Sequence, residues 1–175
     1  MGPEALFAPW RQEYVEKVDA APPKQAGSGS FLLDDWLAPQ LDERNNVVHR
    51  GEHGLILLNK FPYTGGHLLV ALGEPRPRLL DYSPPQRAAL WSLVDLAADI
   101  LERALAPQGI NIGINQGRAA GAGVPQHLHV HLVPRWSGDV NFMEAVGQVR
   151  VIPASLTAMA ARLRAVVPAA LASQP

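Results

Sequence analysis

The stretch VPQHLHVHLVPRW, residues 124–136, places three histidines at alternate positions within an otherwise apolar run. Alternation is typical of a β-strand, in which every second side chain points to the same face of the sheet. The pattern predicts a strand over residues 127–133 with His127, His129 and His131 on one face. At about 3.3 Å per residue, the three side chains would span roughly 13 Å. Such a strand would bury its leucines and valines and present three imidazole rings together.

Three interpretations of this row of histidines are open. Each ring could be satisfied by its own hydrogen bond, as single histidines usually are, although three in register are rare by chance. Two rings could share a metal ion such as Zn²⁺, but the middle ring cannot easily pair with both neighbours around one ion. The rings could instead handle an anion, with one imidazole as nucleophile or proton donor and its neighbours donating to phosphate oxygens.

The loop before the histidines favours an anion. The sequence GRAAGAGV, residues 117–124, contains Gly117, Gly121 and Gly123 and ends at Val124. Glycine lets a backbone approach a ligand closely, and successive backbone N–H groups in turns form anion-binding nests. The loop is not a P-loop, because no Lys-Ser/Thr pair follows it. Together, the glycine-rich loop and the histidines predict a phosphate-binding site.

Further strands and two helices are predicted around this stretch. The strand patterns are residues 46–50, 54–59, 67–72 and 110–116. The longest helix is expected over residues 83–106, because Ser83 and Gln86 form a capping box. Its apolar stripe consists of Leu90, Leu93, Val94, Ala97, Leu101, Ala104 and Leu105. A second helix is expected within residues 151–168. This order predicts an α+β fold, in which an antiparallel or mixed sheet carries helices on one side.

Composition narrows the class of protein. The chain has 175 residues, of which 47% are hydrophobic and 18% charged, as expected for one globular domain. The formal net charge of −1 gives no broad basic surface, so we expect no nucleic acid partner. No apolar run is long enough for a membrane helix, and no secretory signal is present, so we expect a cytoplasmic protein without a membrane partner. Cysteine is absent, which excludes disulfides, thiolate zinc sites and a cysteine nucleophile.

Three regions are predicted along the chain. Residues 1–45 read as an N-terminal extension with a short amphipathic helix near residues 6–18 and a Pro/Gly/Ser-rich loop at residues 20–29. Residues 46–168 would form the catalytic domain, and residues 169–175 a tail.

The histidine stretch also resembles a known family. HLHVHLV matches the signature of the histidine triad (HIT) superfamily of nucleotide hydrolases and transferases. LNKFPYTGGHLLVAL, residues 58–72, resembles the second block of that family. Three more segments resemble its bacterial diadenosine tetraphosphate phosphorylase/hydrolase branch: LFAPWRQEYV at 6–15, NIGINQGRAAGAG at 111–123 and PRWSGDVNFM at 134–143. The similarity covers most of residues 6–165.

The resemblance implies a fold and a reaction. The fold would have about five antiparallel strands, a long helix and a C-terminal helix, usually assembled as a homodimer. The substrate would be a dinucleoside polyphosphate such as diadenosine tetraphosphate. His129 would attack the α-phosphorus and form a nucleotidyl-histidine, which water or phosphate then cleaves. His127 and His131 would hold non-bridging phosphate oxygens. A nucleophilic His129 must be neutral, so its other nitrogen should donate to a fixed acceptor such as a backbone carbonyl.

The resemblance also assigns supporting residues. His67 would support the histidine row from a neighbouring strand. Asn59 would contact a ribose, although it could equally be a turn residue that satisfies its own backbone. Asn115 and Gln116 would lie near a phosphate or the leaving group, and the backbone of residues 117–124 would bind phosphate. Arg118 and Arg135 are either phosphate contacts or solvated surface side chains.

The sequence departs from the family in two ways. Many relatives carry a cysteine pair that binds zinc near the position of residues 27–31; its absence here predicts no structural metal and no tightly bound cofactor. A divalent cation could still accompany the polyphosphate substrate. Relatives also carry a polar Gln or Ser where Gly123 and Val124 stand here, so backbone N–H groups would replace those side chains. The alternatives are a nucleoside phosphoramidate hydrolase, a nucleotide-binding sensor without turnover, and a histidine-ligated metal protein.

Overall fold

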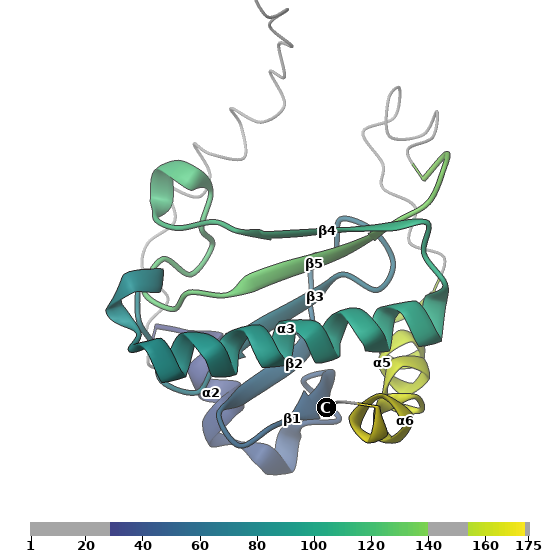
Figure 1. The fold of residues 1–175 in the computed structure, drawn as a ribbon, viewed down its shortest axis with the longest axis horizontal. Helices are drawn as coiled ribbons and strands as arrows, with labels where there is room; N and C mark the ends of the chain where they lie inside the picture. The colour runs from purple at the N-terminus through teal and green to yellow at the C-terminus, as the bar shows by residue number, and fades with distance from the viewer. Residues whose placement is uncertain (1–28, 140–153, 174–175) are drawn as a thin grey trace, which may run out of the picture.

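The strands form one antiparallel sheet in the computed structural model, which describes residues 29–139 and 154–173 (Figure 1). The strand order is β1-β2-β3-β5-β4, and every neighbouring pair is antiparallel. The strands are β1 (Val47–Arg50), β2 (Gly54–Leu58), β3 (Leu68–Leu72), β4 (Gly109–Ile114) and β5 (Val130–Arg135). The predicted α+β class with a five-stranded antiparallel sheet is confirmed.

Helices cover the sheet unequally. The long helix α3 (Pro84–Leu105) runs across one face, and α5 (Leu156–Arg164) and α6 (Val167–Ala172) pack at one end of the same layer (Figure 1). The short helix α2 (Phe31–Leu37) packs against the opposite face. Three short 3₁₀ turns complete the described structure: η1 (Pro39–Leu41), η2 (Leu79–Asp81) and η3 (Arg118–Ala120).

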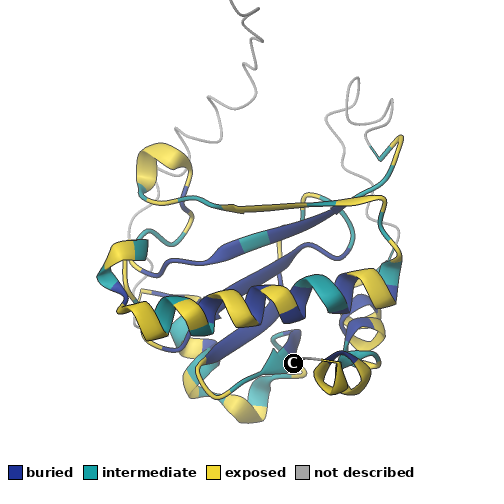
Figure 2. Cartoon of the chain, in the orientation of Figure 1, coloured by how far each residue is buried: buried dark blue, intermediate teal, exposed yellow. Residues whose placement is uncertain are grey.

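The alternation of side chains along β3 divides the interior into two cores. Leu68, Val70 and Leu72 join the larger core beneath α3, whereas Leu69 and Ala71 join a smaller core beneath α2. Both sets are buried, so β3 is a central strand with apolar contacts on each face (Figure 2). The smaller core reaches only β1, β2 and β3, which leaves the same face of β5 and β4 outside it.

Local sequence signals set the limits of α3. Ser83 caps the helix by accepting from the Gln86 N–H, and the Gln86 side chain accepts from the Ser83 N–H, which is the predicted capping box. Ala106 ends the helix in the left-handed conformation. The predicted apolar stripe is buried except for Leu105, which is partly buried.

The second predicted helix is confirmed as α5, which lies within residues 151–168. Residues 169–175 were predicted to be a tail, but α6 continues to Ala172 and Ala170 is fully buried. A proline is not suited to the interior of a helix but is tolerated in its first turn, and here Pro168 lies in the first turn of α6. At the other end, α2 belongs to the folded core although the predicted extension included it.

Some predicted features lie outside the described residues: the amphipathic helix near residues 6–18, most of the loop at 20–29, and the end of the PRWSGDVNFM segment. Among the described helices, none is both long enough and apolar enough to cross a bilayer.

Candidate active site

His129 lies directly before β5, where the preceding loop meets the sheet. The side chain is only 5% exposed, and its Nδ1 is 2.8 Å from the backbone carbonyl oxygen of His127. Because a carbonyl can only accept, Nδ1 carries the proton and Nε2 keeps its lone pair. This Nε2 has no hydrogen-bond partner within the described part of the chain. The predicted backbone partner of His129 is confirmed.

His131 and His67 form a second pair of rings. Nε2 of His67 is 3.0 Å from Nδ1 of His131, across the β3–β5 boundary. Nδ1 of His67 accepts the Tyr63 backbone N–H at 3.2 Å, so the His67 proton must be on Nε2. His67 therefore donates to Nδ1 of His131, and the proton of His131 resides on Nε2. These contacts fix a half-buried His131 as a neutral hydrogen-bond donor.

The loop of residues 59–66 holds the His67 ring. The Asn59 amide nitrogen is 3.4 Å from Nδ1 of His67, and the Thr64 hydroxyl donates to the Pro134 carbonyl at 2.9 Å. Gly66 has a φ of +88°, and a Cβ at this position would lie 2.5 Å from Cδ1 of Leu105. Only glycine suits this backbone and this space. The loop is thus tied both to β5 and to α3, and it keeps His67 fully buried.

The rings of His129 and His131 lie side by side, with centroids 4.9 Å apart and planes tilted by 59°. Burial lowers the pKa of His129, against a smaller opposing effect of its bond to the His127 carbonyl. Burial also lowers the pKa of His131 to about 4, and the neighbouring His129 adds to this effect. Both rings are therefore uncharged at neutral pH, one offering a lone pair and the other an N–H.

His127 departs from the prediction. It was expected to share a face with the other two rings and to hold phosphate oxygens, but it is fully buried and precedes β5 by three residues. Its Nε2 is 2.7 Å from the Leu72 carbonyl oxygen, and its Nδ1 is 2.8 Å from the Ser30 hydroxyl. With both nitrogens engaged inside the protein, the ring has no atom left for a substrate. The prediction of a strand starting at residue 127 was wrong for the same reason.

Comparison with known proteins agrees with this geometry. Residues 40–138, more than half of the chain, match the HIT domain. The chain belongs to the HIT family. It is 35% identical over 152 residues to the AP-4-A phosphorylase of Mycobacterium tuberculosis, an alignment that covers 86% of this chain and 77% of that protein.

Two further proteins are similar to part of this chain, one in sequence and one in structure. The bis(5'-nucleosyl)-tetraphosphatase [asymmetrical] of Schizosaccharomyces pombe is 34% identical over 95 residues, covering 54% of this chain and 52% of that protein. The crystal structure of a zinc-bound histidine triad family protein from Mycobacterium smegmatis superposes with a TM-score of 0.62 and 29% identity, covering 74% of this chain and 88% of that one.

The glycine-rich loop of this HIT domain is built on left-handed residues. Gly117 has a φ of +84° and Gly121 a φ of +87°, so both positions favour glycine. Gly123 has no such constraint, and a Cβ there would meet nothing within 4 Å. The backbone N–H groups of Gly123 and Val124 donate no hydrogen bond to any described residue. They are the donors that the sequence predicted for phosphate.

Several of the other side chains predicted to contact a substrate form hydrogen bonds or ion pairs within the protein. Asn59 accepts the Phe61 N–H at 2.9 Å, the turn role that competed with ribose binding. Gln116 accepts the Leu79 N–H at 2.9 Å, and Arg135 forms an ion pair with Asp139. Asn115 is half-buried. Arg118 is exposed in η3. The roles predicted for these residues toward a substrate remain predictions.

An exposed part of the sheet surface lies beside His131 in the HIT domain. Gly113 of β4 is paired with His131, so the two positions share one face of the sheet with Asn111 and Gly109. All three β4 residues are exposed, and a Cβ at Gly113 or Gly109 would meet nothing within 4 Å. Because glycine has no side chain, Gly109 and Gly113 leave space for a ligand on the sheet face that carries the His131 ring.

The described residues offer no ready metal site. They contain no group of three or more His, Cys, Asp or Glu side chains arranged to hold an ion. His127, His67 and Nδ1 of His131 and His129 are already used in protein hydrogen bonds.

Three positions in the site were missed from the sequence. The Ser30 hydroxyl, the Leu72 carbonyl and the Tyr63 backbone N–H fix the histidine rings. Of these, only Ser30 carried a usable signal, since a serine directly before the apolar run FLLDDWL is typical of a helix N-cap.

Lowering the pH should destabilise the HIT fold. Burial lowers the pKa of His127, His129 and His131 below 6.5, that of His131 to about 4. In the unfolded chain the three rings bind protons near pH 6.5, whereas in the folded chain they bind protons only at lower pH. The part of the folding free energy that depends on neutral rings is therefore complete above about pH 6.5 and declines toward about pH 4. We expect the melting temperature, followed by circular dichroism, to fall by several degrees over this interval. The decrease should be smaller in His131→Phe; an unchanged melting temperature in the parent chain would contradict the burial of neutral rings.

Proposed function

We propose that this HIT protein cleaves dinucleoside polyphosphates, with diadenosine tetraphosphate as the first substrate to test, through a nucleotide attached covalently to His129. The observation that carries the proposal is the complementary pair of rings: a free lone pair on Nε2 of His129 beside a fixed N–H on Nε2 of His131. The names of the mycobacterial and yeast relatives support this class of substrate.

The first step follows from the His129 tautomer. Nε2 of His129 forms a bond to the α-phosphorus, and the bond from that phosphorus to the bridging oxygen breaks, so the remaining polyphosphate leaves with the electron pair. The imidazole becomes cationic as the N–P bond forms. Its Nδ1–H, 2.8 Å from the His127 carbonyl, stabilises that charge and keeps the ring aligned.

Neutral groups would hold the phosphate. The Nε2–H of His131 can donate to a non-bridging oxygen beside the attacking nitrogen, and the backbone N–H groups of Gly123 and Val124 supply further donors. Burial, backbone hydrogen bonds and neighbouring histidines account for the pKa shifts of the three ring groups. A divalent cation bound to the polyphosphate would supply the missing positive charge.

In the second step, an acceptor oxygen attacks the phosphorus and neutral His129 leaves. The mycobacterial relative, which is similar over most of the chain, favours inorganic phosphate as acceptor. Diadenosine tetraphosphate should then yield ADP and ATP when phosphate is present and little product when it is absent. Separation of the nucleotides by ion-exchange chromatography measures the outcome. AMP and ATP formed at equal rates with and without phosphate would show that water is the acceptor, and no cleavage under either condition would refute the proposed function.

We also propose that the protein is a homodimer. Within the part of the chain that the structure describes, the edge strand β4 pairs only with β5, and Ile112 on this strand is 46% exposed. An unpaired edge with an exposed apolar side chain is a surface that a second copy could cover. Sedimentation velocity should give the mass of two chains, and Ile112→Lys should shift the protein toward one. A parent chain that sediments as a monomer at all concentrations would contradict this proposal.

A further inference from the structure

Ser30 connects the N-terminal helix to the histidine site. It is only 1% exposed, it caps α2 by accepting the Leu33 N–H at 3.3 Å, and its hydroxyl lies 2.8 Å from Nδ1 of His127. Ser30 and His127 are 97 residues apart in the sequence. Beside this contact, the Gln126 amide donates to the Gly29 carbonyl, so two neighbouring residues of each segment are joined.

The direction of the Ser30 hydrogen bond follows from the other side of the ring. Nε2 of His127 is 2.7 Å from the Leu72 carbonyl, which can only accept, so Nε2 carries the ring proton. Nδ1 is then an acceptor, and the Ser30 hydroxyl must donate to it. The serine oxygen still has a lone pair for the Leu33 N–H. The hydrogen bond from Ser30 is therefore compatible with only one neutral tautomer of His127, the one protonated at Nε2.

His127 in turn holds the nucleophile through its backbone. Its ring is fixed between α2 and the end of β3, and its carbonyl accepts the Nδ1–H of His129 at 2.8 Å. The two hydrogen bonds of the ring anchor residue 127, so the loss of one would loosen the backbone that carries this carbonyl. We propose that Ser30 is a positioning residue, which sets the orientation of the His129 nucleophile through His127. This inference rests on the proposed function of His129.

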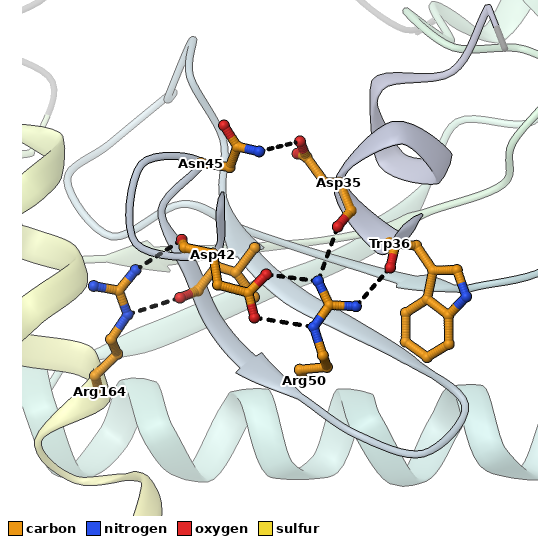
Figure 3. Close-up of polar contacts among 7 residues, drawn as sticks. Asp35, Trp36, Asp42, Asn45, Arg50 and Arg164 are labelled. Atoms are coloured by element: carbon orange, nitrogen blue, oxygen red, sulfur yellow. Dashed lines mark hydrogen bonds and ion pairs between the residues drawn. The ribbon is translucent and has the colours of Figure 1, made fainter. Parts of the chain in front are cut away.

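The opposite end of α2 is anchored by several polar contacts (Figure 3). Arg50 donates to the Trp36 and Asp35 carbonyls, each at 2.8 Å, and its guanidinium lies 5.2 Å from the centre of the Trp36 ring. The same guanidinium forms a two-pronged ion pair with Asp42. Arg164 of α5 adds bonds to the Val47 and Asp42 carbonyls. The helix is therefore held at its C-terminal end by the sheet and at its N-terminal end by His127.

The competing explanation is that Ser30 only caps α2. Ser155 provides a matched control, because it caps α5 by accepting the Ala158 N–H at 3.2 Å and forms no hydrogen bond with a histidine in the described structure. Ser30→Ala removes a cap and a hydroxyl donor, whereas Ser155→Ala removes only a cap. Ser30→Thr keeps both functions, since threonine is a good N-cap and suits the extended backbone of residue 30, with φ −128° and ψ 110°.

Steady-state kinetics with diadenosine tetraphosphate separate the two explanations. We expect Ser30→Ala to lower kcat about tenfold with KM within about twofold, because a mispositioned nucleophile impairs the chemical step more than binding. Ser30→Thr should restore most of kcat, and Ser155→Ala should leave it unchanged. Equal kcat in Ser30→Ala and Ser155→Ala, or no recovery in Ser30→Thr, would overturn the inference.

A second measurement does not depend on turnover. Long-range ¹H–¹⁵N NMR spectra report which ring nitrogen of each histidine carries the proton. In the parent chain His127 should be protonated at Nε2, and in Ser30→Ala its Nδ1 resonance should shift as the donor is lost. A parent chain with His127 protonated at Nδ1 would overturn the inference even if Ser30→Ala failed to fold. If the parent chain cleaves no dinucleoside polyphosphate, the proposed function fails, and the NMR result still decides whether the Ser30 hydroxyl donates to Nδ1 of His127.

Discussion

Replacing His129 with alanine should lower the rate of diadenosine tetraphosphate cleavage by about 10⁴- to 10⁶-fold, as expected when a covalent nucleophile is removed. The Nε2 lone pair of His129 is the only one among the four clustered rings that no described residue engages. No neighbour can substitute for it, because Nε2 of His131 carries a proton. Binding of the substrate should change little, since His131 and the backbone donors remain.

The measurement is a single-turnover assay with labelled substrate, followed by denaturation and detection of protein-bound nucleotide. The parent chain should yield a labelled protein, and His129→Ala should yield none. His53→Ala, an exposed histidine in the turn between β1 and β2, is the matched control and should behave like the parent chain. A His129→Ala variant with more than about one tenth of the parent rate would refute covalent catalysis by this residue.

Replacing His131 with phenylalanine should lower kcat by about 10²- to 10³-fold, the usual effect of removing one preorganised donor to a developing charge. Phenylalanine keeps the planar ring between His67 and His129 but lacks the Nε2–H that is proposed to donate to the substrate. It also leaves Nε2 of His67 without its acceptor at 3.0 Å. The loss should appear in kcat more than in KM, because the hydrogen bond strengthens as the transition state forms.

His67→Phe separates the two contributions to this effect. In that variant His131 keeps an N–H, but no donor fixes its tautomer, so we expect a smaller decrease in kcat than in His131→Phe. The comparison requires only steady-state kinetics and melting temperatures of both variants. If His131→Phe retained the parent kcat, the donor role of His131 would be wrong, whatever the stability of the variant.

The fold could be predicted from the sequence wherever local signals determine it. Ser83, Gln86 and the apolar stripe define α3 within a few residues of chain, and the four other strands begin and end within two residues of their predicted limits. β5 was misplaced by three residues because its start depends on distant partners. His127 is held by Ser30, 97 residues away, and by the Leu72 carbonyl, 55 residues away, and these contacts keep it off the shared face of the strand.

The site was predictable in its residue types but not in its division of roles. Alternation alone predicts three equivalent rings, whereas the structure engages both nitrogens of His127 inside the protein and leaves one nitrogen each of His129 and His131 without a described partner. Which nitrogen carries each proton depends on the Tyr63 N–H and on two carbonyl groups. These are backbone groups, so the residue types in the sequence do not reveal the contacts. Asn59 and Gln116 bond to nearby backbone N–H groups for a similar reason, because loop geometry decides where an amide points.

The proposed mechanism, with weakly basic histidine rings, favours some departing groups over others. With a pKa of about 4, His131 has almost no acidic proton to give at neutral pH. An amine or alcohol expelled from phosphorus needs such a proton, whereas a polyphosphate departs as a stable anion. The enzyme would therefore cleave a substrate faster when its departing group is more acidic. A plot of log kcat against the conjugate-acid pKa of the departing group should have a steep negative slope. Nucleoside phosphoramidates and simple alkyl esters would fall at the slow end of that line, even where they fit the site.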